Sequence, residues 1–123
     1  MNLSVAMLNA VISGGGTFQV TRSMFGKLKL TPVEFEVGYL VAHAQGLDNE
    51  YVLYRDTIEQ FIIEHYLVDS DFRYLGLWQD PETGNWSIDS VQNILDVEIA
   101  FRAAEENRQK AIWSNVSKRA LTV

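Results

Sequence analysis

The chain has 123 residues, of which 47% are hydrophobic and 21% charged, which is the size and composition of one globular domain rather than of a disordered segment. It contains no cysteine, which excludes disulfides, thiolate metal sites and cysteine nucleophiles and is typical of a reducing, cytoplasmic compartment. No apolar run approaches the roughly 20 residues that span a bilayer. No positive charge precedes the apolar N-terminus, so neither a membrane helix nor a signal peptide is predicted.

Charge is distributed unevenly along the chain, whose net charge is −6. All 16 acidic side chains lie between residues 34 and 106, whereas most of the basic side chains lie in the two flanking segments. One interpretation is that the basic ends fold back and neutralise the acidic middle. The other is an acidic surface that meets a basic partner or repels nucleic acid. Order along the sequence does not decide between them.

Hydrophobic periodicity predicts three helices separated by short strands. The apolar stripe of residues 3–12 is followed by Gly14, which suits the left-handed end of a helix. Asp56 and Glu59 have the spacing of a capping box, which predicts the start of a second helix. A third helix is expected over about 96–107. Strands are expected over 17–21, 27–31, 35–44, 50–54, 73–78, 86–91 and 111–113, with a turn over 45–49 and a frayed tail over 117–123.

This order of elements predicts a single α+β domain over residues 1–123. We expect a mainly antiparallel sheet with two to three helices packed on one face. The sheet should have open edges, because only two prolines are present to block them. Open edges predict that the protein forms a homo-oligomer.

Residues 77–86 read LWQDPETGNW and predict a tight hairpin corner flanked by two tryptophans. Pro81 fixes one backbone dihedral, Gly84 accepts a positive φ, and the Asp80 side chain can cap the turn. Turn chemistry therefore accounts for the corner without a catalytic role. Tryptophan is enriched at protein interfaces, but whether these two point into the core or toward a partner stays open. The candidate interaction surface consists of Trp78, Asp80, Glu82 and Trp86.

No residue pattern predicts a catalytic, cofactor-binding or metal site. His43 and His65 lack the spacing of a ligand pair and are interpreted as structural. Glycines 14–16 follow a helix instead of opening one, which is the reverse of a phosphate-binding loop. The acidic corner of the hairpin disfavours direct binding to nucleic acid. Five acidic residues lie near one another in the sequence but have neither the spacing of a calcium-binding loop nor a base paired with them, so no metal or catalytic role is predicted for them. They are Asp69, Asp71, Asp80, Glu82 and Asp89.

The C-terminal half contains Tyr-Leu-Gly-x-Trp at 74–78, Asp-Pro-Glu-Thr-Gly at 80–84, and a predicted helix that begins with Asp96 and is followed by Ala-Ile-Trp at 111–113. This arrangement resembles a pattern in small uncharacterised proteins of actinobacteria and their phages. The resemblance covers about residues 37–113 and is weaker in the first third. It implies a small accessory protein, borne by a phage or prophage and located in the host cytoplasm, and it implies no activity.

Three hypotheses about function follow. The leading hypothesis is a non-enzymatic accessory protein that needs no cofactor and acts by protein–protein interaction with a host protein or with itself. The alternative is an acidic nucleic-acid mimic that blocks a host DNA-binding protein. The second alternative is a small enzyme with an unrecognised site, which would require a pocket that gathers His43 or His65 with two or more carboxylates.

Overall fold

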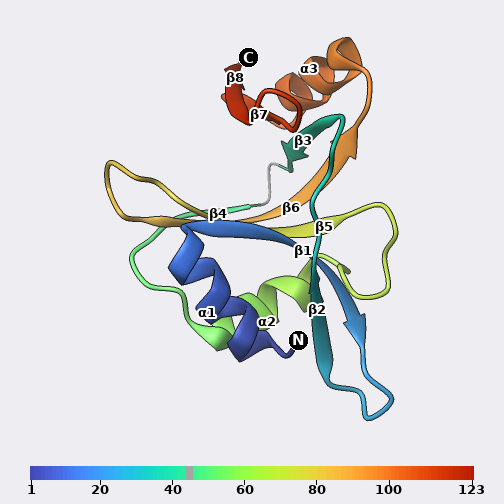
Figure 1. Cartoon of the computed structure of the whole chain (residues 1–123), viewed down its shortest axis with the longest axis vertical. Coiled ribbons are helices and arrows are strands. Elements are labelled where there is room, and N and C mark those ends of the chain that lie inside the picture. Colours follow the sequence, from blue (N-terminus) through green and yellow to red (C-terminus); the bar gives the residue numbers. More distant parts are fainter. Residues whose placement is uncertain (44–45) are drawn as a thin grey trace.

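A computed structural model describes residues 1–43 and 46–123, which form three helices and a sheet of eight strands (Figure 1). This confirms the predicted α+β class. None of the described helices is long and apolar enough to cross a membrane. The helices are α1 (Leu3–Ser13), α2 (Arg55–Glu64) and α3 (Val97–Glu106). The strands are β1 (Gly15–Arg22), β2 (Leu28–Pro32), β3 (Tyr39–Ala42), β4 (Leu47–Glu50), β5 (Tyr74–Gln79), β6 (Trp86–Ile94), β7 (Ala111–Ser114) and β8 (Arg119–Thr122).

Strand β6 joins the two ends of the sheet. The strand order is β2-β1-β5-β6-β3-β7-β8, and all of these neighbours are antiparallel. The first half of β6 also pairs with β4, whereas its second half pairs with β3. In Figure 1 the long β6 leads from the part of the molecule that holds α1 and α2 to the part that holds α3, β7 and β8.

The larger core lies between α1, α2 and one face of β1, β5 and β6. Because side chains alternate along a strand, Leu77 and its partner Ile88 point to the same face, and both are fully buried. Each fully buried aliphatic or aromatic side chain stabilises the fold by roughly 1.5–3 kcal/mol. The helices contribute Leu3, Ala6 and Ala10 from α1 and Ile58, Phe61 and Ile62 from α2.

A smaller core lies under α3. Ala100 and Ala104 of this helix pack against Val41 of β3 and Ile112 of β7. Val41 pairs with Gln92, and residues 88, 90 and 92 alternate onto the same face of β6. All three helices therefore cover one face of the sheet, as predicted, and within residues 1–43 and 46–123 the opposite face carries no helix.

The hairpin between β5 and β6 has the predicted corner. The Glu82 N–H donates to the Asp80 carboxylate at 2.8 Å, and the Gly84 N–H donates to the Asp80 carbonyl at 2.8 Å. Gly84 has φ +76°, the positive value predicted for it. The register pairs Trp78 with Ser87 and Gln79 with Trp86. The two tryptophans therefore point to opposite faces of the sheet and are not neighbours across the strands.

The predicted N-terminal cap of α3 is confirmed, whereas that of α2 is wrong. Asp96 caps α3 as expected, because its carboxylate accepts a hydrogen bond from the Ile99 N–H at 3.0 Å. The capping box at Asp56 is wrong. Tyr54 occupies the N-cap of α2 and makes no side-chain hydrogen bond there, so Asp56 lies inside the first turn. In that position its negative charge still interacts favourably with the helix dipole.

Two predicted strands around residue 45 are also corrected. The strand expected over 35–44 is shortened to β3, and residues 33–38 form a linker instead. Strand β4 falls in the predicted turn over 45–49 and pairs with β6, which offers a free edge there, and no strand continues over 51–54. Ala44 and Gln45 lie outside the described residues.

The C-terminal tail is ordered, so the prediction of a frayed segment over 117–123 is wrong. Strand β8 pairs with β7 along four residues, from Ala111↔Thr122 to Ser114↔Arg119. The Lys118 N–H closes the turn by donating to the Ser114 carbonyl at 2.8 Å, and Leu121 packs against the smaller core. Backbone pairing and this contact hold the tail even though most of its side chains are exposed.

Candidate interaction groove

The helix-free face of the sheet is hollowed along its length. Three cavities of about 600, 210 and 630 Å³ share Trp78 as a lining residue. Leu40 and Trp113 line the first and second cavities, and Asp89 lines the second and third. The cavities therefore form one continuous groove, named the Trp78 groove after the residue they share.

Trp78 lies flat on the sheet because two glycines beneath it have no side chains. A Cβ on Gly76 would fall 2.8 Å from the indole Nε1, and one on Gly15 would fall 3.0 Å from Cε3. The register pairs Gly15 with Trp78. The glycines of β1 and β5 therefore make the floor on which the indole rests.

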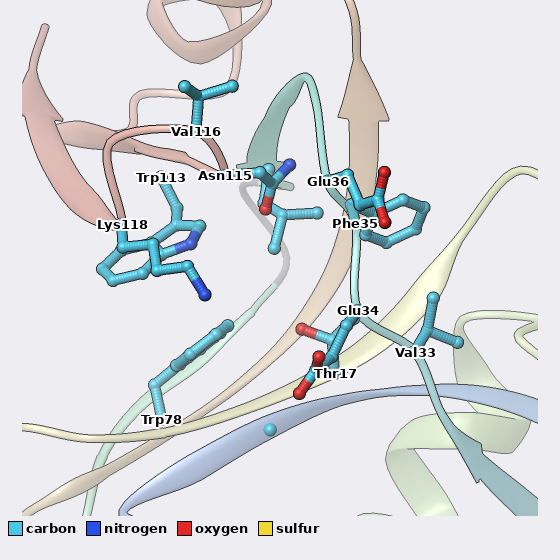
Figure 2. Close-up of a pocket in the computed structure, with 12 residues that line it drawn as sticks. Thr17, Val33, Glu34, Phe35, Glu36, Trp78, Trp113, Asn115, Val116 and Lys118 are labelled. Carbon is cyan, nitrogen blue, oxygen red and sulfur yellow. The ribbon is translucent and has the colours of Figure 1, made fainter.

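Trp113 stands beside Trp78 although 35 positions separate them in the chain. Their ring centroids are 6.2 Å apart and their planes are inclined by 31°. Trp113 faces the groove because it pairs with Leu40 of β3. Both indoles are half-buried, and Figure 2 shows them on the same side of the hollow. The pair forms a continuous aromatic surface that faces the groove.

The opposite wall of the groove is the linker 33–38. It runs from β2 to β3 and must cross β1, β5 and β6, and Figure 1 shows it passing over them. A buried Asn115 fixes its far end: the side-chain amide donates to the Val37 carbonyl at 3.1 Å and to the Asn93 amide oxygen at 2.9 Å. Phe35 packs edge-on against Tyr74, with centroids 5.1 Å apart. The linker is thus tied to the sheet at two points.

Charged side chains of both signs surround the aromatic pair. Glu34, Glu36 and Lys118 line one end of the groove (Figure 2). At the other end, burial and then the neighbouring carboxylate of Asp48 raise the pKa of Asp89 from 3.8 to about 7. The same end also contains Arg108 and Lys110. The groove therefore has an apolar centre and a mixed charged rim.

The predicted interaction surface is divided by the fold. Trp78 lies at the centre of the groove. Asp80 and Glu82 are exposed in the hairpin corner and do not line the groove. Trp86 is only 5% exposed and belongs to the larger core beneath the other face. Of the four residues, only Trp78 contributes to the groove, and Trp86 supports the sheet from the opposite side.

The two histidines lie outside the Trp78 groove. His65 ends α2 and stacks on Phe61 with ring centroids 4.0 Å apart, and its Nδ1 lies 3.0 Å from the Phe61 carbonyl oxygen. Burial, followed by the positive charges of Arg73 and His65, lowers the pKa of His43. Among residues 1–43 and 46–123 no three His, Cys, Asp or Glu side chains come together as metal ligands.

Several groove residues had no signal in the sequence. The sequence predicts Trp113 only as part of a short strand, and its contact with Trp78 depends on β3 and β6 lying between β7 and β5. Asn115 lies outside every predicted element. Gly76 lies inside the predicted strand 73–78, where a glycine often marks a close approach, but the sequence does not say what approaches, and Gly15 falls in the glycine run that follows the first predicted helix.

Comparison with protein-family models, with curated proteins and with solved structures finds no match for this chain. The resemblance to actinobacterial and phage proteins therefore stays a prediction.

Proposed function

We propose that this protein is a non-enzymatic interaction protein whose Trp78 groove binds an extended segment of a partner protein. The observation that carries the proposal is the Trp78–Trp113 pair, half-buried at the centre of an open groove that no helix covers. Aromatic side chains in such positions supply much of the binding energy of protein interfaces. The setting implied by the resemblance completes the proposal: an accessory protein of phage or prophage origin that acts on a host protein in the cytoplasm.

The shape of the groove favours a chain over a compact ligand. The three cavities adjoin one another along the sheet and are open to solvent, whereas small-molecule sites enclose most of the surface of their ligand. Charges of both signs lie at the ends, with Glu34 and Lys118 at one and Arg108 at the other. An apolar centre with a polar rim is the usual organisation of a protein interface.

The two alternative functions have less support from the groove. A nucleic-acid mimic needs acidic groups arranged like phosphates, but basic Lys118, Arg108 and Lys110 share the rim with the acids. An enzyme would gather a histidine with carboxylates, and neither His43 nor His65 lines the groove. Protein binding therefore remains the proposal with a specific observation behind it.

A pull-down from an actinobacterial lysate tests this proposal. The bait is the full chain, compared with Trp78→Ala, Trp113→Ala and the matched control Phe25→Ala, which removes an 83% exposed aromatic ring outside the groove. We expect a protein that is retained by the wild type and the control and is lost from both tryptophan variants. Truncation of a central aromatic residue typically costs about 2 kcal/mol or more, which is roughly 30-fold in affinity. A partner retained equally by all four baits would contradict binding at the groove.

A further inference from the structure

Helix α1 has apolar side chains on its outward face as well as on its buried face. Leu3, Ala6 and Ala10 point into the larger core. The other side exposes Val5 by 43%, Leu8 by 59%, Val11 by 53% and Ile12 by 76%. The spacing of residues 5, 8 and 12 places three of these side chains in one stripe along the helix. The stripe formed by Val5, Leu8, Val11 and Ile12 is called the α1 face.

The other two helices provide an internal comparison. The outward side of α2 carries Arg55, Asp56 and Glu64 beside one exposed apolar residue, Ile63, and that of α3 carries Glu98, Arg102, Glu105 and Glu106 beside Val97 and Ile99. Residues 1–21 contain no ionisable side chain at all. Helix α1 also exposes the uncharged polar residues Ser4, Asn9 and Ser13, but four of its exposed side chains are apolar and none of its side chains is charged. The α1 face therefore has the composition of a surface that another molecule covers.

We propose that the α1 face is the contact surface of a symmetric homodimer, in which α1 of one copy packs against α1 of a second copy. In a two-fold dimer each residue near the axis meets its own counterpart, so a charged face would repel itself whereas an uncharged apolar face fits itself. The chain has a net charge of −6, and the α1 face lies in its one long segment without ionisable side chains. Arg22, Lys27, Arg55 and Glu59 line a hollow beside Leu3 and Ser4, whereas the α1 face itself has no charge, so two copies can meet at its centre without like charges opposing each other.

The absence of basic residues argues against a membrane as the occupant. Helices that lie on membranes combine their apolar face with Lys and Arg that attract anionic lipids. Helix α1 has no basic residue, and the net charge of the protein would be repelled by such a surface. A second copy of the chain presents an identical uncharged, apolar face, which matches the α1 face in both respects.

The dimer would leave the Trp78 groove free. Helix α1 covers one face of the sheet, and the groove lies on the other face. Each copy would therefore present its own groove, and the dimer would be bivalent toward a partner with repeated segments. Dimerisation does not depend on the groove having the function proposed for it, since separate residues form the two surfaces.

The α1 face can be altered without disturbing the fold. The helix is held by the Asn2 cap, which accepts from the Val5 N–H at 2.9 Å, and by paired hydrogen bonds between Met1 and Leu30. Leu8 lies at the midpoint of α1 and points to solvent, so a change there removes no core contact. The midpoint is also the position expected to lie nearest the two-fold axis.

Sedimentation equilibrium of the full chain tests the dimer. We expect the wild type to shift from monomer to dimer between about 1 and 200 µM, the weak range that suits a contact made by a single helix of 11 residues. Leu8→Glu should raise the dissociation constant at least about tenfold, because it buries an unpaired charge. The matched control Ile99→Glu changes a 55% exposed residue on α3 and should leave the dimer unchanged.

Two further measurements test whether a second copy of the chain covers the α1 face. A mixture of Leu8→Glu and Leu8→Lys should form heterodimers, because opposite charges would then meet at the axis. The chain has no cysteine, so Leu8→Cys introduces a single thiol that should form an intermolecular disulfide on mild oxidation, whereas Ile99→Cys should not. A wild type that stays monomeric at 200 µM overturns the proposal. So does a dimer that Leu8→Glu leaves intact, or a monomer that binds phosphatidylcholine vesicles through the α1 face.

Discussion

The indole of Trp78 lies over Gly76, two residues earlier on the same strand, so closely that a Cβ on Gly76 would fall 2.8 Å from Nε1. Gly15 on the adjacent strand leaves the second half of the space that the ring occupies. The orientation of the indole therefore depends on Gly15 and Gly76 having no side chains. Because Trp113 approaches to 6.2 Å, the same gap also determines how the aromatic pair faces the groove.

Gly76→Ala should displace the Trp78 ring toward solvent. The added Cβ would meet the indole at 2.8 Å and Val91 Cγ1 at 3.1 Å, and the half-exposed indole is the group that can move. We expect a modest change in the free energy of unfolding, within about 1 kcal/mol, because alanine is otherwise better than glycine in a strand. Iodide quenching of tryptophan fluorescence should increase, since more of the indole meets solvent.

Gly16→Ala is the matched control for that experiment. Its Cβ would fall 3.0 Å from a Phe18 ring atom, so the strain arises at a phenylalanine of the buried core and not at a tryptophan. Quenching should then stay at the wild-type level. If Gly76→Ala also left quenching unchanged, the indole would not rest on the glycine floor in solution.

Trp78→Ala and Trp86→Ala should differ sharply in their effect on stability. Trp86 is 5% exposed and packs in the larger core, so its truncation should lower the free energy of unfolding by about 3–5 kcal/mol. Trp78 is half-buried on the open face, and we expect its loss to cost roughly 1–2 kcal/mol. Urea unfolding followed by far-ultraviolet circular dichroism measures both. Equal costs would make Trp78 a structural residue rather than one that faces a partner.

Asn115→Ala should loosen the linker that walls the groove. Its side-chain amide donates to Val37 and Asn93, and truncation would leave the Asn93 amide oxygen without that donor. A lost buried hydrogen bond of this kind costs about 1–3 kcal/mol. Hydrogen exchange of residues 34–38 should accelerate while α1 exchanges as before. Gln60→Ala removes the exposed hydrogen bond that the Gln60 side-chain amide donates to the Glu64 carboxylate, and it should leave the linker unchanged.

Local signals in the sequence predicted the elements that depend on neighbouring residues. The hairpin corner and the Asp96 cap arise from contacts within a few positions, and both form. The first helix also forms, but its expected stripe of Leu3, Met7, Ala10 and Val11 is buried only in part, since Val11 is 53% exposed. The errors fall where pairing is distant. Strand β4 pairs with β6 about 40 positions later, and β8 is held by an edge that exists only once β7 joins β3. Periodicity does not reveal which edge will be free to accept a strand.

The groove was predictable only in part for the same reason. The sequence places Trp78 in the candidate interaction surface because it flanks a turn. Its partner Trp113 comes from the other end of the sheet. Trp86 is predicted in the same surface because it flanks the corner on the other side. In the structure the register offsets Trp78 and Trp86 by one residue, and this offset turns their side chains to opposite faces of the sheet. The residues of a turn of this length do not determine the register of the two strands to within one residue, so the sequence could not predict which faces the two side chains occupy.

Asp89→Asn should change how stability depends on pH. The folded protein holds a proton on Asp89 up to about pH 7, whereas the unfolded chain releases it near pH 3.8. The folded state therefore binds more protons across this window, and the contribution of Asp89 to stability is lost as the pH rises through about 7. The asparagine variant has no such proton. It should gain up to about 2 kcal/mol over the wild type between pH 5.5 and 8.5, at roughly 1.36 kcal/mol per pH unit.

Urea unfolding of both proteins at pH 5.5, 7.0 and 8.5 measures this difference, and the other titrating groups cancel between them. Asp48→Asn provides the second arm, because it removes the carboxylate that assists burial in raising the pKa of Asp89. The loss of stability should still begin near pH 3.8, the value of the unfolded chain, but it should level off at a lower pH and be smaller in total than in the wild type. A wild-type-minus-variant difference that stays flat across the three pH values would mean that Asp89 is already ionised at pH 5.5, and that the end of the Trp78 groove is more open to water than its packing indicates.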